Sequence, residues 1–303
     1  MNAGGESETR CGFVALLGAP NAGKSTLMNT MVGAKVSIVT QKVQTTRTRI
    51  LGVTALDRTQ LVFVDTPGIF KPRRRLDRAM VAAAWSGAAD ADIVALLIDA
   101  GMRIEGDTQR IIDGLKQNGG RAICVLNKID TVPRENLLKL IDDLQAEEIF
   151  SDFFMVSALK SDGVEELKAA LAERLPAGPW HFPEDQLSDM NDRLFAAEIT
   201  REKLFLNLHQ ELPYALTVET ETWEPFDNGA VKVEQVIYVE RASQKGIVLG
   251  KGGERIKRVR ALAQEDLQEL MGRDVHLFLF VKVRENWGDD PERYRDWGLD
   301  FST

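Results

Sequence analysis

The sequence predicts an α/β domain with a mostly parallel six-stranded sheet, followed by a smaller α+β domain. Residues 11–175 alternate short apolar runs with longer amphipathic stretches, a pattern typical of helices packed around a parallel sheet. Residues 176–190 contain closely spaced prolines, which predict a semi-rigid linker. Residues 191–285 then follow a different order of helices and strands. A chain of 303 residues has room for about two such domains.

Six apolar runs account for the strands of the first domain. They are residues 13–17, 49–55, 61–64, 93–98, 122–126 and 153–156. Helical periodicity predicts helices at residues 76–89, 105–117, 134–147 and 163–173. The second and third strands are close in sequence, so we expect them to form an antiparallel hairpin at the edge of the sheet.

A glycine-rich stretch, GAPNAGKS, follows the first strand and leads into a helix. It matches the pattern GxxxxGK[ST] in the strand-to-helix context that a phosphate-binding loop requires. Backbone N–H groups would surround a phosphate, Lys24 would reach the β- and γ-phosphates, and the Ser25 hydroxyl would bind Mg²⁺. The expected nucleotide-binding residues here are Gly18, Asn21, Ala22, Gly23, Lys24, Ser25 and Thr26.

Two later stretches are suited to sensing a γ-phosphate. The polar loop at residues 41–47 contains two threonines, of which Thr46 is expected to complete the Mg²⁺ coordination and Thr45 is the alternative. The third strand ends at Asp65, which would hold Mg²⁺ through a water molecule, and the Gly68 N–H would donate to the γ-phosphate. The expected metal ligands are Ser25, Thr46 and Asp65, and the expected phosphate-side residues are Asp65, Thr66, Pro67 and Gly68.

The fifth strand leads into NKID, residues 127–130, which predicts guanine as the base. A carboxylate at Asp130 accepts from both N1–H and the amino group of guanine, whereas adenine has a lone pair at N1. Asn127 would tie this loop to the phosphate loop, and the Lys128 side chain would lie over the base. The expected base-side residues are Asn127, Lys128, Asp130, Ser157, Ala158 and Leu159. GTP and GDP are therefore the predicted ligands.

Hydrolysis of GTP to GDP and phosphate is expected to be slow. Ile69 is apolar and stands where small GTPases commonly carry the glutamine that orients the attacking water. No catalytic residue is assigned beyond the support that Lys24, Asp65 and Gly68 give to phosphoryl transfer. The expected intrinsic rate is on the order of 10⁻⁴ to 10⁻² s⁻¹.

The second domain has the element order of a type II KH domain, with a GxxG loop at residues 250–253. Residues 241–260 hold seven basic residues and one acidic residue, in a chain whose net charge is −8. The glycine loop and these charges predict a clamp for about four single-stranded nucleotides. The expected RNA-binding residues are Lys245, Gly250, Lys251, Gly252, Gly253, Arg255 and Lys257.

The remaining composition favours a cytosolic protein whose nucleic-acid contacts are local, because its overall charge is negative. Cys11 and Cys124 are far apart and are expected to be buried, reduced thiols. No apolar run reaches the length of about 18 residues that a membrane span needs. Residues 1–10 are interpreted as a disordered tail. The basic residues 71–75 could contact RNA or anionic lipid, but a solvated loop is the favoured interpretation. The aromatic residues of the tail at 286–303 could stack on bases, but packing on the second domain is favoured.

From about residue 12 to 286 the chain resembles the Era family of bacterial GTPases. The resemblance rests on GAPNAGKS, QTTRTR, DTPGI, NKID and SAL, and then on REKL, ELPY and GKGGERIK. It implies a Ras-like P-loop GTPase domain followed by a type II KH domain. Val43 departs from the family pattern, in which many members carry proline before QTT.

The resemblance also implies a function and partners. The expected protein is a monomeric GTPase that binds the 3′ end of 16S ribosomal RNA during assembly of the 30S subunit, with peripheral contact to the inner face of the membrane. Asn21 stands where several related GTPases bind K⁺. Two alternatives are a GTPase subunit that assists an RNA-modifying enzyme and a static RNA-binding scaffold.

Overall fold

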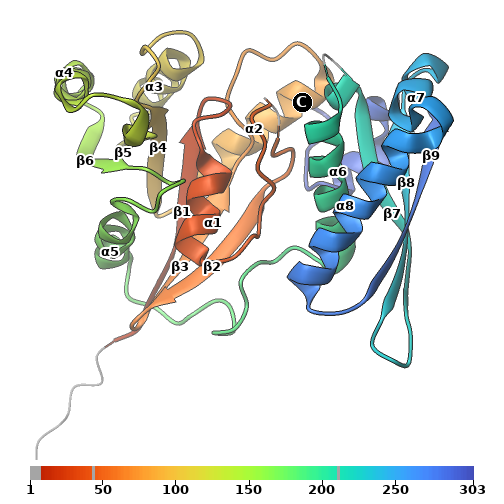
Figure 1. The fold of residues 1–303 in the computed structure, drawn as a ribbon. Coiled ribbons are helices and arrows are strands. Elements are labelled where there is room, and N and C mark those ends of the chain that lie inside the picture. Colours follow the sequence, from red (N-terminus) through yellow and green to blue (C-terminus); the bar gives the residue numbers. More distant parts are fainter. Residues whose placement is uncertain (1–7, 43–44, 210–211) are drawn as a thin grey trace, which may run out of the picture. The chain divides into compact units, whose positions relative to one another are not determined.

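The computed structural model describes residues 8–42, 45–209 and 212–303, which form two compact units (Figure 1). Among the described residues, unit 1 comprises 8–37, 46–189 and 294–303, and unit 2 comprises 38–42, 45, 190–209 and 212–293. Val43, where the family pattern has proline, lies outside the described residues, as does most of the expected N-terminal tail. No described helix is both long enough and apolar enough to span a bilayer.

Unit 1 is built on a sheet of six strands among the described residues, in the order β2-β3-β1-β4-β5-β6. The strands are β1 (Arg10–Gly18), β2 (Ile50–Leu56), β3 (Thr59–Asp65), β4 (Ile93–Asp99), β5 (Ala122–Asn127) and β6 (Phe150–Val156). β2 pairs antiparallel with β3, and all other pairings are parallel. The expected edge hairpin is therefore confirmed. Arg10, which the sequence places in a tail, is instead the first residue of β1.

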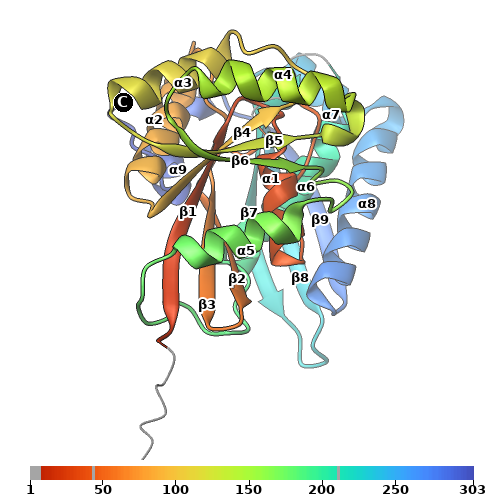
Figure 2. The same ribbon diagram turned by 90° about the vertical axis from the view of Figure 1, so that its left-hand side faces the viewer.

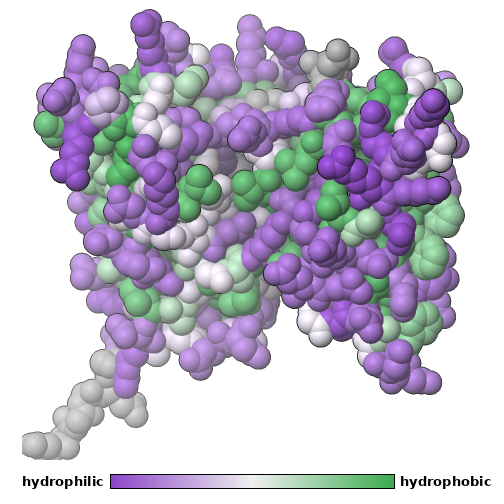
Figure 3. Space-filling model, viewed as in Figure 1, coloured by the Kyte–Doolittle hydropathy of each residue, from purple (hydrophilic) through white to green (hydrophobic). Residues whose placement is uncertain are grey.

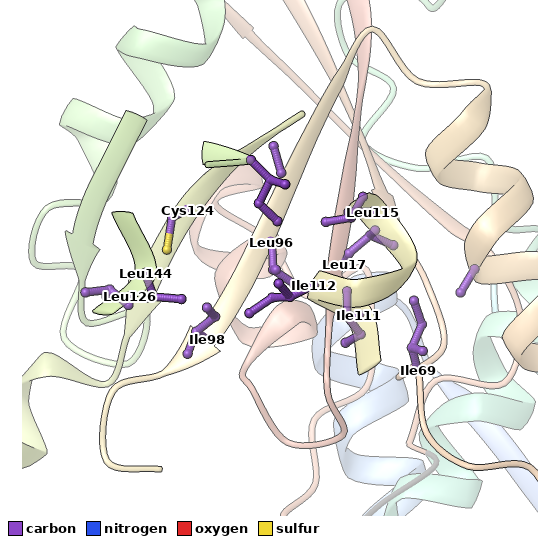
Figure 4. Packing of buried hydrophobic residues seen from close by; sticks show 13 residues of the cluster. Leu17, Ile69, Leu96, Ile98, Ile111, Ile112, Leu115, Cys124, Leu126 and Leu144 are labelled. Atoms are coloured by element: carbon purple, nitrogen blue, oxygen red, sulfur yellow. The ribbon is translucent and has the colours of Figure 1, made fainter. Parts of the chain in front are cut away.

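Helices cover both faces of this sheet (Figure 2). They are α1 (Lys24–Val32), α2 (Arg75–Ala89), α3 (Asp107–Gln117), α4 (Arg134–Gln145) and α5 (Val164–Arg174). On one face, apolar side chains of α3 and α4 pack with Leu17, Leu96 and Leu126 of the central strands (Figure 4). On the other face α1 and α5 contact β2 and β3. Cys11 and Cys124 are free and buried, as the sequence predicts.

Unit 2 contains a three-stranded sheet of order β7-β8-β9 among the described residues. Its elements are α6 (Asp192–Asn207), β7 (Leu216–Pro225), β8 (Val231–Val239), α7 (Ala242–Leu249), α8 (Glu254–Met271) and β9 (Val275–Val283). β8 is antiparallel to β7 and parallel to β9. Val233 and Leu277 of the sheet pack with Ala263 and Leu267 of α8, so alternate strand residues form the core.

Two segments lie where sequence patterns alone do not place them. Residues 176–189, expected as a linker, belong to unit 1, where Gln60 Nε2 donates to the Phe182 carbonyl at 2.8 Å. The C-terminal tail divides between the units. Trp287 is buried in unit 2 and its indole N–H donates to the Ala215 carbonyl at 3.1 Å, but Tyr294 and Leu299 pack on α2 in unit 1. The expectation that the whole tail packs on the second domain is therefore wrong for residues 294–303.

Candidate nucleotide and nucleic-acid sites

The phosphate loop joins the end of β1 to the start of α1 and is held open by a glycine. Gly23 has a φ of 98°, and a Cβ there would lie 2.2 Å from Asn127 Nδ2. Lys24 Nζ donates to the carbonyls of Gly18 (3.0 Å) and Ala19 (3.1 Å). Burial lowers the pKa of Lys24 to about 8, although the nearby Asp65 carboxylate acts in the opposite direction. The loop therefore holds a buried cation at the start of α1, which suits an anionic ligand.

Three hydroxyl groups surround the Asp65 carboxylate. Asp65 Oδ2 accepts from Ser25 Oγ at 2.7 Å, Ser37 Oγ at 2.9 Å and Thr46 Oγ1 at 3.1 Å. Asp65 Oδ1 is buried and has no hydrogen-bond partner among the described residues. Burial raises the pKa of Asp65, against the opposing effects of Lys24 and the three hydroxyl groups. A buried acceptor beside hydroxyl oxygens fits a small, hard cation such as Mg²⁺.

The two threonines proposed for metal coordination lie in different surroundings. Thr46 Oγ1 is 3.0 Å from Ser25 Oγ, and Thr46 belongs to unit 1. Thr45 belongs to unit 2, where its hydroxyl group is 2.7 Å from Thr40 Oγ1 and donates to the Lys42 carbonyl at 2.7 Å. The structure thus brings Thr46 together with Ser25 and Asp65, while its role as a ligand stays a prediction.

The DTPG loop closes tightly against the phosphate loop within unit 1. A Cβ at Gly68 would lie 3.0 Å from the Cα and N atoms of Pro20, so only glycine fits without displacing the backbone. The Ile69 N–H donates to the Gly18 carbonyl at 3.2 Å, and its side chain is buried in the apolar core (Figure 4). Ile69 therefore offers no group to orient a water molecule, as its residue type predicts.

At the predicted base-binding end of the site, Asn127 joins the NKID loop to the phosphate loop, as the sequence predicts. Asn127 Nδ2 donates to the Ala22 carbonyl at 2.9 Å, and Asn127 Oδ1 accepts from the Ala158 N–H at 3.0 Å. Asp130 Oδ1 accepts from Ser157 Oγ at 2.7 Å, which is the main reason that the pKa of Asp130 is lowered. Lys128 differs in one respect from the expectation, because its Nζ pairs with Asp99 Oδ2 at 2.6 Å.

In unit 2, the glycine loop follows α7 and precedes α8. Gly252 and Gly253 have φ values of 59° and 78°, and a Cβ at either would meet no atom within 4 Å. The loop borders a pocket of about 630 Å³. Its lining combines the expected Gly250, Lys251 and Arg255 with Glu254 and Arg258 of the charged segment 241–260. It also includes residues that the sequence did not indicate, namely Leu206, Asn207 and His209.

Leu206 and Asn207 end α6 and His209 follows it, more than 40 positions before the glycine loop. No sequence pattern pointed to them, because the exposure of the apolar Leu206 is visible only in the structure. Lys245 and Lys257, by contrast, are not among the residues that line the pocket. Strongly hydrophilic residues gather around the N-terminal part of α8 on the face shown in Figure 3, in agreement with the basic count there.

Two family models match separate parts of the chain. Residues 13–128 match the family model described as 50S ribosome-binding GTPase, and residues 211–288 match the KH domain model. The chain is 61% identical to GTPase Era of Sinorhizobium medicae over 97% of its own length and 94% of that protein. It is 60% identical to GTPase Era of Rhizobium meliloti, over 99% of its own length and 96% of that protein.

Two solved structures match nearly the whole chain. One is Era in complex with MgGDPNP and nucleotides 1506–1542 of 16S ribosomal RNA, with a TM-score of 0.91 and 36% identity over 96% of this chain and 99% of that one. The other is a point variant of Aquifex aeolicus Era bound to GDP and AlF₄⁻, with a TM-score of 0.90 and the same identity and coverage. A guanine-nucleotide site and a KH unit in one chain, together with these identities, show that the protein belongs to the Era family of GTPases.

Proposed function

We propose that this protein binds and slowly hydrolyses GTP and binds the 3′ end region of 16S ribosomal RNA, and that it thereby assists maturation of the 30S subunit. The observation that carries the proposal is the pairing, in one chain, of a phosphate loop tied to a guanine-recognition loop with a basic GxxG unit. The solved Era complex with MgGDPNP and 16S ribosomal RNA supports it. A monomer acting in the cytoplasm, with peripheral membrane contact, is proposed on the family relationship alone.

The chemistry of the nucleotide site follows from its own residues. Lys24 places a cation beside the phosphates, and the backbone of the phosphate loop supplies N–H donors. Ser25, Thr46 and Asp65 are the groups that would hold Mg²⁺, which when bound neutralises charge that develops on the phosphates. Since Ile69 is buried in the core, we assign no side chain of the chain to the activation of water, which agrees with a slow intrinsic reaction.

Nucleotide-dependent RNA affinity distinguishes a switch from a scaffold. With a non-hydrolysable GTP analogue bound, affinity for the 16S 3′ RNA is expected to be about tenfold higher than with GDP, a typical coupling between two sites. Titration of labelled RNA into each loaded form measures this. Gly252→Asp is the control variant. Gly252 has a φ of 59°, which Asp tolerates, and the new carboxylate would repel the RNA phosphates. The RNA affinity of this variant should fall about tenfold, and its nucleotide affinity should be unchanged. Equal affinities in both nucleotide states would favour the scaffold.

The alternative in which the protein assists an RNA-modifying enzyme has less support. Within the described part of the chain, no group of three or more His, Cys, Asp and Glu side chains is arranged to hold a metal ion. Cys11 and Cys124 are both buried, and burial raises the pKa of each thiol. A buried, protonated thiol is a poor nucleophile, so neither cysteine suits a modification reaction.

We further propose that Asn21 binds K⁺ beside the phosphates. Its φ of 63° places this residue in the left-handed region at the centre of the phosphate loop. A monovalent cation there would add positive charge in the transition state, so hydrolysis should be faster in KCl than in NaCl at the same ionic strength, by about tenfold. Asn21→Ala should remove the difference. Equal rates of phosphate release in the two salts would contradict the proposal.

A further inference from the structure

A second strongly basic surface lies on unit 1, at the loop that follows the DTPG tetrapeptide and at the start of α2. Residues 71–78 contain five basic residues and one acidic residue. The basic residues are Lys71, Arg73, Arg74, Arg75 and Arg78, and all five are exposed. This group, here called the arginine loop, contributes nothing to the nucleotide site described above.

The arginine loop keeps a net charge of 5 − 1 = +4 after its own acidic residue is counted. The acidic residue, Asp77, is 6% exposed, and its Oδ2 accepts from the backbone N–H groups of Arg73 and Arg74 at 3.0 Å each. Among the described residues, Lys71, Arg73, Arg74 and Arg78 form no ion pair. In a protein with a net charge of −8, uncompensated cations gathered on one surface indicate an anionic partner.

The loop is presented on a firmly packed support. Ala79 and Met80 of α2 form an apolar cluster with Tyr294 and Leu299 of the C-terminal segment, and all four are buried. Arg75 lies over the Phe301 ring, 4.4 Å from its centroid. Both views show the chain end beside α2 (Figures 1 and 2). Ordering of the start of α2 by this cluster lowers the entropy cost of binding a ligand there.

We propose that the arginine loop is a second RNA contact, which binds the sugar-phosphate backbone without reading sequence. The proposal rests on the RNA-binding function proposed above and adds a surface on unit 1 to the GxxG surface on unit 2. Four of the five cations are arginines, whose planar guanidinium groups bind phosphate oxygens in pairs. An RNA long enough to leave the KH unit would supply those phosphates.

A membrane is a poorer fit to the same surface. Helices that lie on a bilayer need an exposed apolar face beside their basic residues. The apolar face of α2 is buried against the sheet and the C-terminal segment, and no large hydrophobic residue between positions 71 and 89 is among the exposed ones. Phosphates of a nucleic acid require only the cations.

The test compares two variants with equal loss of charge. One is Arg73→Gln/Arg74→Gln/Arg78→Gln, and its matched control is Arg121→Gln/Arg134→Gln/Lys139→Gln, which removes three exposed cations elsewhere on unit 1. Each protein, loaded with a GTP analogue, is titrated with nucleotides 1506–1542 of 16S ribosomal RNA and with a 3′ fragment of about six nucleotides, over a range of salt. Binding to phosphatidylserine vesicles is measured in parallel.

The arginine-loop variant should bind the long RNA roughly 50-fold more weakly at about 0.15 M salt, with a salt exponent smaller by about 2. Its affinity for the short fragment should be unchanged, and the control should bind both RNAs like the wild type. Equal affinity and salt exponent for the long RNA in all three proteins would overturn the inference, as would loss of vesicle binding alone. Failure of the wild type to bind either RNA would instead refute the proposed function.

Discussion

An Asp130→Asn variant is expected to bind GTP at least a hundredfold more weakly and to prefer xanthosine triphosphate. One oxygen of the Asp130 carboxylate accepts from Ser157 Oγ at 2.7 Å, and Lys160 Nζ lies 3.5 Å from the other. These contacts orient the carboxylate and lower its pKa, so it is ionised at neutral pH and can accept from both donors of guanine. An amide offers one acceptor and one donor, which matches the N1–H and O2 groups of xanthine instead.

The measurement is competition of GTP, xanthosine triphosphate and ATP for a fluorescent nucleotide. Asp113→Asn is the matched control, because this aspartate is exposed on α3 and distant in sequence from the nucleotide motifs. The control should retain the wild-type order of affinities. If Asp130→Asn still selects GTP over xanthosine triphosphate, Asp130 is not the group that recognises the base.

An Asp65→Asn variant is expected to hydrolyse GTP at least a hundredfold more slowly, yet to be no less stable than the wild type without nucleotide. Asp65 is the carboxylate among the hydroxyl groups of Ser25, Ser37 and Thr46, so its loss removes the negative charge that would attract Mg²⁺. Without a cation, however, this carboxylate is a buried charge with one oxygen that lacks a hydrogen-bond partner among the described residues.

The raised pKa of Asp65 determines whether the free energy of unfolding rises or falls with pH. Between the ordinary value of 3.8 and the higher folded value, the folded protein holds a proton that the unfolded chain has lost. The free energy of unfolding of the wild type therefore falls as pH rises between these two pKa values. The free energy of unfolding of the Asn variant should not show this decrease. Urea unfolding of the nucleotide-free proteins with a chelator present, from pH 4 upward, measures it. A wild-type rate of single-turnover hydrolysis in the variant would contradict the metal assignment.

The nucleotide motifs were readable from the sequence because their chemistry is local. Backbone N–H groups that surround a phosphate belong to consecutive residues of one loop, so GAPNAGKS predicts a phosphate-binding loop without a structure. Asp130 similarly follows the end of a buried strand, and strand ends of a parallel sheet meet at one edge. The antiparallel β2–β3 hairpin was predictable for the same reason, because the connection between its strands is short.

Tertiary packing decided what depends on residues far apart in sequence. Thr45 and Thr46 are neighbours of the same type, and only the fold brings the second to Ser25 and turns the first toward Thr40. The pairing of Lys128 with Asp99 could not be read from NKID, since Asp99 ends a different strand.

By itself, the sequence determined the fold class, and it predicted a guanine nucleotide as the ligand and the glycine loop at residues 250–253 as the RNA contact, because each depends on the order of neighbouring residues and on their hydrogen-bonding chemistry. Only the tertiary structure decided where the C-terminal segment packs. The sequence favoured packing of its aromatic residues over stacking on bases but did not indicate their partner, because burial of Tyr294 with Met80 removes apolar surface from water only once α2 has formed. The same packing supports the start of α2, which carries part of the arginine loop, so the position of this basic surface depends on the tertiary structure.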